Sequence, residues 1–69
     1  MRHQDYDVLE RAIVRGERLA LRRRGTEFLV IPLALRQENG REVVDTRNPT
    51  TGDEMALFLD ELDAVERVG

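Results

Sequence analysis

The chain contains no cysteine, lysine, serine or tryptophan among its 69 residues. Without cysteine it can form neither a disulfide framework nor a thiolate metal site, and nothing opposes a reducing compartment. Serine, cysteine and lysine are the usual nucleophiles of acyl transfer and Schiff-base chemistry. The single histidine, His3, lies near the N-terminus, where a side chain is poorly placed for general-base catalysis. We therefore expect a protein without enzymatic activity and without a cofactor.

Long apolar stretches are also missing. No window approaches the roughly 18 apolar residues that cross a bilayer, and the first ten residues lack the apolar centre of a secretion signal. We expect a soluble, cytoplasmic protein with no membrane contact. The net charge is −3, from 14 acidic residues against 11 arginines. This acidity argues against broad binding of a phosphate backbone but leaves room for a local basic patch.

The first clear period in the chain is helical. Its apolar residues recur at the spacing of one helix face: Tyr6, Leu9 and Ile13. Asp7 can cap the N-terminus with Glu10 three residues later, as in a capping box, although a start at Asp5 fits equally well. Gly16 stands where a left-handed residue would end the helix. We predict a helix over about residues 6–15.

From residue 18 onward the apolar period falls to two, which is typical of a strand. A two-residue hairpin loop at Arg24 and Gly25 would join apolar residues to apolar ones and a base to an acid across the strands. The predicted cross-strand pairs are Arg23–Thr26, Arg22–Glu27, Leu21–Phe28 and Leu19–Val30. The second strand of this hairpin is apolar on both faces, and Pro32 within it predicts a bend or an edge position.

The rest of the chain alternates strands with turn residues. The predicted elements are a turn at 37–40, a strand at 41–47, a hairpin loop at 48–53, a strand from 54 to about 59, a turn at 60–61 and a strand over 63–68. Phe58 requires cover on the second face of its strand, from the helix or from a partner chain.

One helix followed by five short strands with tight turns is the order of a small Sm-like or SH3-like barrel. We therefore predict a mainly β protein with one N-terminal helix and a five-stranded antiparallel barrel. It forms a single domain over residues 1–69, with the helix at about 6–15 and the barrel at about 18–68.

Three consecutive arginines in the first hairpin suggest nucleic-acid binding at first sight. Pleating sends Arg22 and Arg24 to one side and Arg23 to the other, so the triplet is not one continuous basic surface. A solvated strand face is the simpler interpretation. A shorter patch remains as an alternative, and its arginines are Arg18, Arg22, Arg24, Arg36 and Arg41.

Two acidic groups invite a metal or paired-carboxylate interpretation. The first group is His3, Asp5, Asp7 and Glu10, and the second is Asp60, Glu61, Asp63 and Glu66. Carboxylates at a helix start also favour the helix dipole, and the second group follows a turn without an implied apolar pocket. We expect no metal at either group.

Several motifs together resemble the Rho-binding antiterminator (Rof-like) family. They are DYDVLERAI, a glycine-punctuated first hairpin, EVV in the third predicted strand and FLDEL before the last one. The pairs Tyr6–Asp7 and Leu9–Glu10 are the distinctive part, and the resemblance covers most of the chain. IPL and FLDEL also resemble WYL domains, although EVV stands in place of the Trp-Tyr-Leu that names them.

The antiterminator resemblance implies a helix on a five-stranded Sm-like barrel. It also implies regulation of transcription by binding the termination helicase Rho, where an acidic face blocks the site that would take RNA. The contact residues implied by the motif are Asp5, Tyr6, Asp7 and Glu10. Their charge suits competition with a phosphate backbone for the cationic side chains of a partner.

Two alternatives remain open. One is an Sm-like or WYL-like module that binds RNA or another nucleic acid through the arginine patch. The other is a self-associating structural domain, because the second strand and Phe58 carry more apolar surface than one small barrel obviously hides. The second alternative predicts a homo-oligomer.

Overall fold

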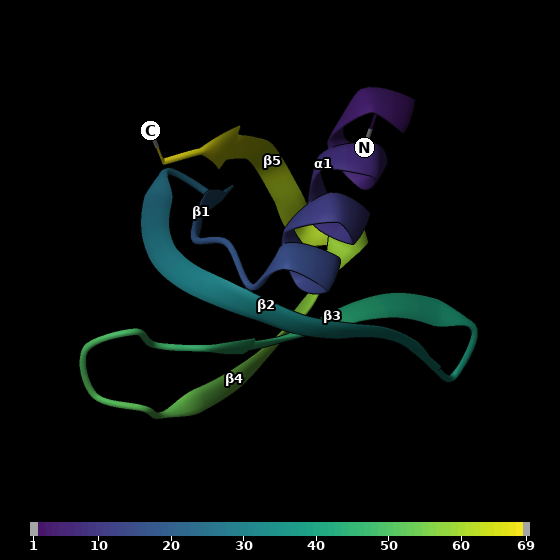
Figure 1. Ribbon diagram of the computed structural model, residues 1–69. Coiled ribbons are helices and arrows are strands. Elements are labelled where there is room, and N and C mark those ends of the chain that lie inside the picture. The colour runs from purple at the N-terminus through teal and green to yellow at the C-terminus, as the bar shows by residue number, and fades with distance from the viewer. Residues whose placement is uncertain (1, 69) are drawn as a thin grey trace.

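The computed structural model describes residues 2–68 as one helix and five antiparallel strands (Figure 1). This confirms the predicted mainly β class with one N-terminal helix. The elements are α1 (His3–Arg15), β1 (Leu19–Arg23), β2 (Thr26–Glu38), β3 (Arg41–Arg47), β4 (Glu54–Phe58), the 3-10 turn η1 (Leu59–Glu61) and β5 (Leu62–Arg67).

The helix begins earlier than predicted. Arg2 occupies the cap position in an extended conformation, without a side-chain cap, and its carbonyl oxygen accepts the amides of Asp5 and Tyr6 at 3.0 and 3.2 Å. The capping box from Asp7 to Glu10 is therefore wrong, because both residues lie inside the helix. The predicted end is confirmed: Gly16 has a φ of 67°, the left-handed conformation that favours glycine.

The first hairpin has the register predicted from its sequence. All four predicted pairs are present, and Arg24 and Gly25 form the loop with φ angles of 50° and 80°. Positive φ at both loop residues is the requirement of a type I′ turn, whose twist matches that of the strands. Asn39 and Gly40 make a second loop of this kind between β2 and β3, so β2 extends to Glu38, beyond the predicted start of that turn.

The sheet has the order β4-β3-β2-β1-β5 and is open, so the predicted closed barrel is wrong. The long strand β2 pairs with β1 through its first half and with β3 through its second half. Its register shifts between Pro32 and Ala34, which confirms the bend predicted at the proline. Closure would require β4 to pair with β5, but β4 has only five residues and η1 turns the chain away between them.

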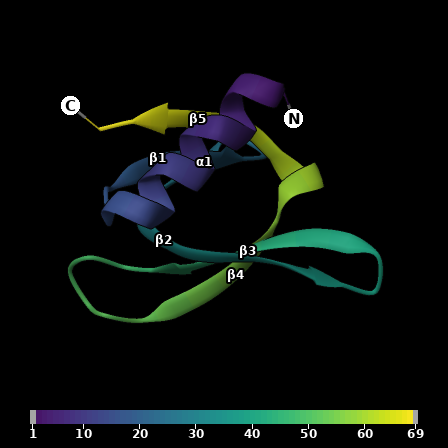
Figure 2. The same cartoon turned by 45° about the vertical axis from the view of Figure 1, so that its right-hand side comes forward.

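Helix α1 lies between β5 and the arc of β2 (Figures 1 and 2). It contributes Leu9 and Ala12, which are almost completely buried, to the core on the inner side of the bent sheet. The other buried members of this core are Leu19, Leu21, Val30, Val44, Leu57, Leu59, Leu62 and Val65. Without the helix, the open sheet would expose this apolar surface to solvent.

The outer face of β3 and β4 is covered by arginines. Phe58 lies beneath the guanidinium of Arg41, whose central carbon is 3.6 Å from the ring centroid. Val43, only 1% exposed, lies opposite Phe58 on one side and Arg36 on the other. Arg41 of the same chain thus provides cover for Phe58.

Candidate functional site

The four contact residues implied by the family resemblance do not share one face of α1. At about 100° per residue, Asp7 and Glu10 lie on neighbouring positions, whereas Asp5 lies almost opposite Asp7. Asp5 and Tyr6 are half-buried, and Asp7 and Glu10 are exposed. The structure therefore brings Asp7 and Glu10 together on the outer surface of the helix, which we call the α1 acidic surface.

The α1 acidic surface makes few ion pairs, although Arg11 and Arg15 line the same shallow depression. The side chain of Asp7 is 55% exposed, and its only ion-pair partner among residues 2–68 is His3, at 3.6 Å and itself 91% exposed. No ion pair of Glu10 occurs in the described part of the chain. Val14, 85% exposed, lies one helical turn beyond Glu10 and adds an apolar contact to this outer side.

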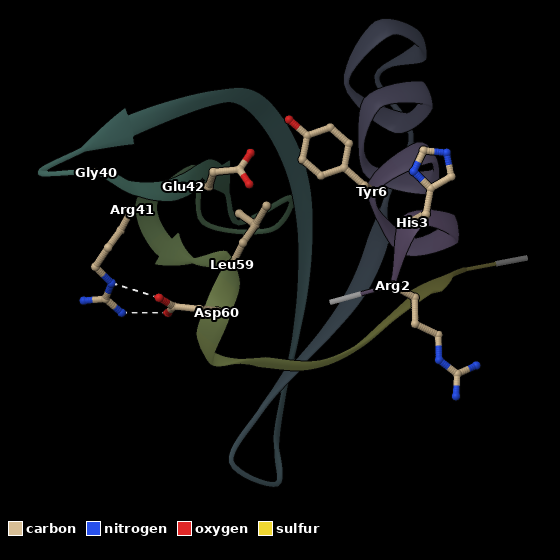
Figure 3. A pocket seen from close by; sticks show the side chains of 8 residues that line it. All are labelled: Arg2, His3, Tyr6, Gly40, Arg41, Glu42, Leu59 and Asp60. Carbon is tan, nitrogen blue, oxygen red and sulfur yellow. Dashed lines mark hydrogen bonds and ion pairs between the residues drawn. The ribbon is translucent and has the colours of Figure 1, made fainter.

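Tyr6 lies one helical turn before Glu10 and lines a cleft of about 550 Å³ between the start of α1, the start of β3 and η1 (Figure 3). Its ring packs against the core, and its hydroxyl faces the carboxylate of Glu42. Hydrogen bonding with Glu42 is the main reason why the pKa of Tyr6 is raised above 10.0. Partial burial and the negative charges of Glu42 and Glu10 act in the same direction, because each disfavours the phenolate.

The opposite wall of the cleft is an ion-pair network. Arg41 donates two hydrogen bonds to Asp60, of 3.0 and 2.7 Å, and a longer one of 3.4 Å to Glu61 (Figure 3). Arg23 approaches Glu61 from the first hairpin at 4.0 Å. The guanidinium of Arg41 lowers the pKa of Asp60, because it stabilises the charged carboxylate. The carboxylates of η1 are thus occupied by arginines of the same chain.

The arginines proposed for nucleic-acid binding do not form one surface. Arg36 is held by Glu38 at 2.8 Å and by Asp45 at 2.9 Å, and Arg41 belongs to the cleft. Both lie at the far end of the long strand β2 from the first hairpin.

Within the first hairpin, Arg22 is 3.7 Å from Glu27. Of the five arginines proposed for the patch, Arg18 and Arg24 have no side-chain ion pair within residues 2–68. The amide of Arg24 instead donates to Asp63, at 2.7 Å. The patch is therefore divided between two sites and is largely neutralised by acids.

Sequence reasoning missed Glu42 and the cleft that it shares with Tyr6. The alternation of β3 indicated the strand but not that its first residues would face the helix start, because that contact depends on how α1 docks. Within residues 2–68, no group of three or more histidines or acids has the arrangement of a metal site. No helix in the described range is long and apolar enough to cross a membrane.

Comparison with protein-family models, with curated proteins and with solved structures finds no match to this chain. A function for the protein therefore has to be inferred from its own residues and their arrangement.

Proposed function

We propose that this protein is a small non-catalytic binding protein of the cytoplasm that regulates transcription by occupying a basic, RNA-binding surface of a partner. The contact is made by the α1 acidic surface, Asp7 and Glu10. The motifs that resemble Rho-binding antiterminators make the termination helicase Rho the partner to test first.

One observation carries this proposal: how the acids and arginines are paired. Arg22, Arg36 and Arg41 are engaged by acids of the same chain, whereas the α1 acidic surface is exposed and makes no ion pair with an arginine within residues 2–68, although Arg11 and Arg15 lie beside it. Exposed carboxylates with an uncommitted charge can attract a cationic cleft and compete with phosphate for it. A chain of net charge −3 is attracted to such a cleft from a distance.

The test is binding of the purified chain to Rho. Asp7→Asn with Glu10→Gln removes both charges of the surface, and Glu17→Gln with Glu66→Gln removes two exposed charges elsewhere as the matched control. Two rim ion pairs of about 0.5 kcal/mol each correspond to about fivefold weaker binding at low salt for the first variant. The difference should shrink as salt is raised, because exposed charges are screened.

The functional consequence is measured as the RNA-dependent ATPase activity of Rho. The parent chain and the control variant should inhibit this activity, and the α1 variant should inhibit less at the same concentration. Absence of a complex at low salt would overturn Rho as the partner. Equal loss of binding in the two double variants would overturn the α1 acidic surface as the contact.

Nucleic-acid binding remains a second candidate because Arg18 and Arg24 have no acidic side-chain partner in the described residues. In that case Arg18→Ala with Arg24→Ala should weaken binding of a single-stranded oligonucleotide and flatten its salt dependence. Unchanged oligonucleotide binding would reject the patch.

A further inference from the structure

A second depression lies at the other end of the sheet from the cleft that Tyr6 lines. It is a groove of about 370 Å³ between the first half of β2 and the hairpin of β3 and β4. Leu29 and Met55 line it while 44% and 36% exposed, and Pro49 lines it from the hairpin loop. We define the β2 groove by these three residues together with Glu27 and Asp53. Its centre is apolar, and its two charged residues are both carboxylates.

The β2 groove also contains an unpaired strand edge. Strand β2 pairs with β1 over residues 26–30, but its pairing with β3 starts only at Ile31. In a two-residue hairpin the pair next to the loop is hydrogen-bonded, so the main-chain groups of Glu27 and Leu29 point away from β1. No hydrogen bond of these two amides to another strand or to a loop occurs within residues 2–68.

The loop opposite this edge is closed by its own hydrogen bonds. Asn48 accepts hydrogen bonds from the amides of Thr50 and Thr51 at 2.8 and 3.1 Å through its side chain. Its own amide donates to the carbonyl oxygen of Asp53 at 2.7 Å, which closes the loop. These hydrogen bonds hold the loop that forms one wall of the groove, and a wall held in this way lowers the entropic cost of binding.

We propose that the β2 groove binds an extended basic peptide, which adds a short strand to the free edge of β2. Main-chain hydrogen bonds to Glu27 and Leu29 would supply affinity, as in other cases of strand addition. An apolar side chain of the peptide would pack on Leu29, and Met55 adds apolar surface to the groove from β4. Because Glu27 and Leu29 point to the same face of β2, a basic side chain two residues from that apolar one would lie near Glu27, and another near Asp53; no lysine or arginine lines the groove to repel them.

The choice of a basic peptide over a second copy of this chain follows from charge. Each copy has a net charge of −3, so two copies repel at the acidic rim of the groove. Glu27 is 3.7 Å from Arg22, but both side chains are about half exposed, and such a contact is weak and easily exchanged. This inference concerns a different face from the α1 acidic surface and does not depend on the proposed function.

The test uses the full chain labelled with ¹⁵N and a blocked hexapeptide in which arginine and valine take turns on one face, with threonine between them (Arg-Thr-Val-Thr-Arg-Thr). Two control peptides are matched to it: one has glutamate in place of arginine, and the other carries N-methyl groups that remove alternate amide donors. We expect the arginine peptide to shift the amide resonances of Glu27 and Leu29 and to slow their hydrogen exchange about tenfold. The two control peptides should bind at least about tenfold more weakly, because each lacks one of the two interactions.

A variant pair tests the apolar part of the groove. Leu29→Ser should weaken the arginine peptide about tenfold, because it removes the largest exposed apolar side chain of the groove. Val68→Ser changes a residue of similar exposure, 48%, outside the groove and should leave binding unchanged. Equal binding of the N-methylated peptide, or shifts confined to α1, would overturn the proposal. So would light scattering that shows a dimer of the parent chain and a monomer of the Leu29→Ser variant.

Discussion

Docking of α1 on the open sheet depends chiefly on Leu9, and Leu9→Ala tests this dependence. Leu9 has no exposed surface and lies among core residues contributed by the strands. Truncation of such a leucine costs about 2–5 kcal/mol, from lost burial and from the cavity that remains. At about 0.05–0.15 kcal/mol per residue, a domain of 69 residues has a free energy of unfolding of only about 3–10 kcal/mol. The substitution therefore removes a large fraction of the total stability.

The assay is urea unfolding followed by circular dichroism. With a slope of about 1 kcal/mol per molar urea for a chain of this size, Leu9→Ala should lower the midpoint by about 2 M or more. Leu9→Met conserves volume and should cost less than about 1.5 kcal/mol, which keeps the series measurable if the alanine variant is unfolded at every urea concentration. Val14→Ala is the matched control on the same helix, because Val14 is 85% exposed.

The Val14→Ala variant should change stability by less than about 0.5 kcal/mol, or raise it slightly, because alanine is the better helix former. Similar midpoints for Leu9→Ala and Val14→Ala would refute the reasoning. Such a result would mean that α1 does not cover the core in solution. The α1 acidic surface would then lack a fixed position relative to the cleft.

Three further predictions concern single interactions. Glu42→Gln should lower the pKa of Tyr6 toward 10.0. The pKa can be read from phenolate absorbance, because Tyr6 is the only tyrosine and tryptophan is absent. An unchanged pKa would show that Glu42 does not raise it. Since the folded pKa is raised, this interaction stabilises the fold below about pH 10 and is lost as pH rises through the folded value. Gly16→Ala should lower the free energy of unfolding by about 1 kcal/mol, and Gly16→Asn should lower it less. Nothing lies within 4 Å of the added Cβ, so the left-handed backbone alone decides the cost. Equal losses for the two variants would contradict this. Thr46→Val should cost about 1 kcal/mol, because the buried hydroxyl donates to the carbonyl oxygen of Met55 at 2.8 Å; unchanged stability to urea would contradict that role.

The local elements of this protein could be predicted because local physics decides them. Arg24 and Gly25 adopt the positive φ angles that a two-residue hairpin needs, and this loop sets the pairing of both strands. Gly16 ends the helix for a similar reason. The helix start could not be read in the same way, since no side chain caps it and the carbonyl of Arg2 accepts the first amides instead.

The candidate site was only partly predictable. The charges of Asp7 and Glu10 and their helical spacing place them side by side from sequence alone. Whether Asp7 and Glu10 are free to bind a partner depends on which acids pair with the arginines of the chain. Arg41, for example, pairs with Asp60, 19 residues away in the chain. Contacts between such distant residues depend on the packing of the whole domain.

The sequence by itself determined one helix, five strands, their turns and the pairing of the first hairpin, because turn geometry and apolar period act over a few residues. Only the tertiary structure decided that the sheet stays open, that α1 covers its inner side, and that Arg41 covers Phe58. The physical reason is that each outcome depends on contacts between residues far apart in the chain, which local turn geometry and apolar period do not determine. The β2 groove exists for the same reason: it appears where β2 leaves β3 to follow β1.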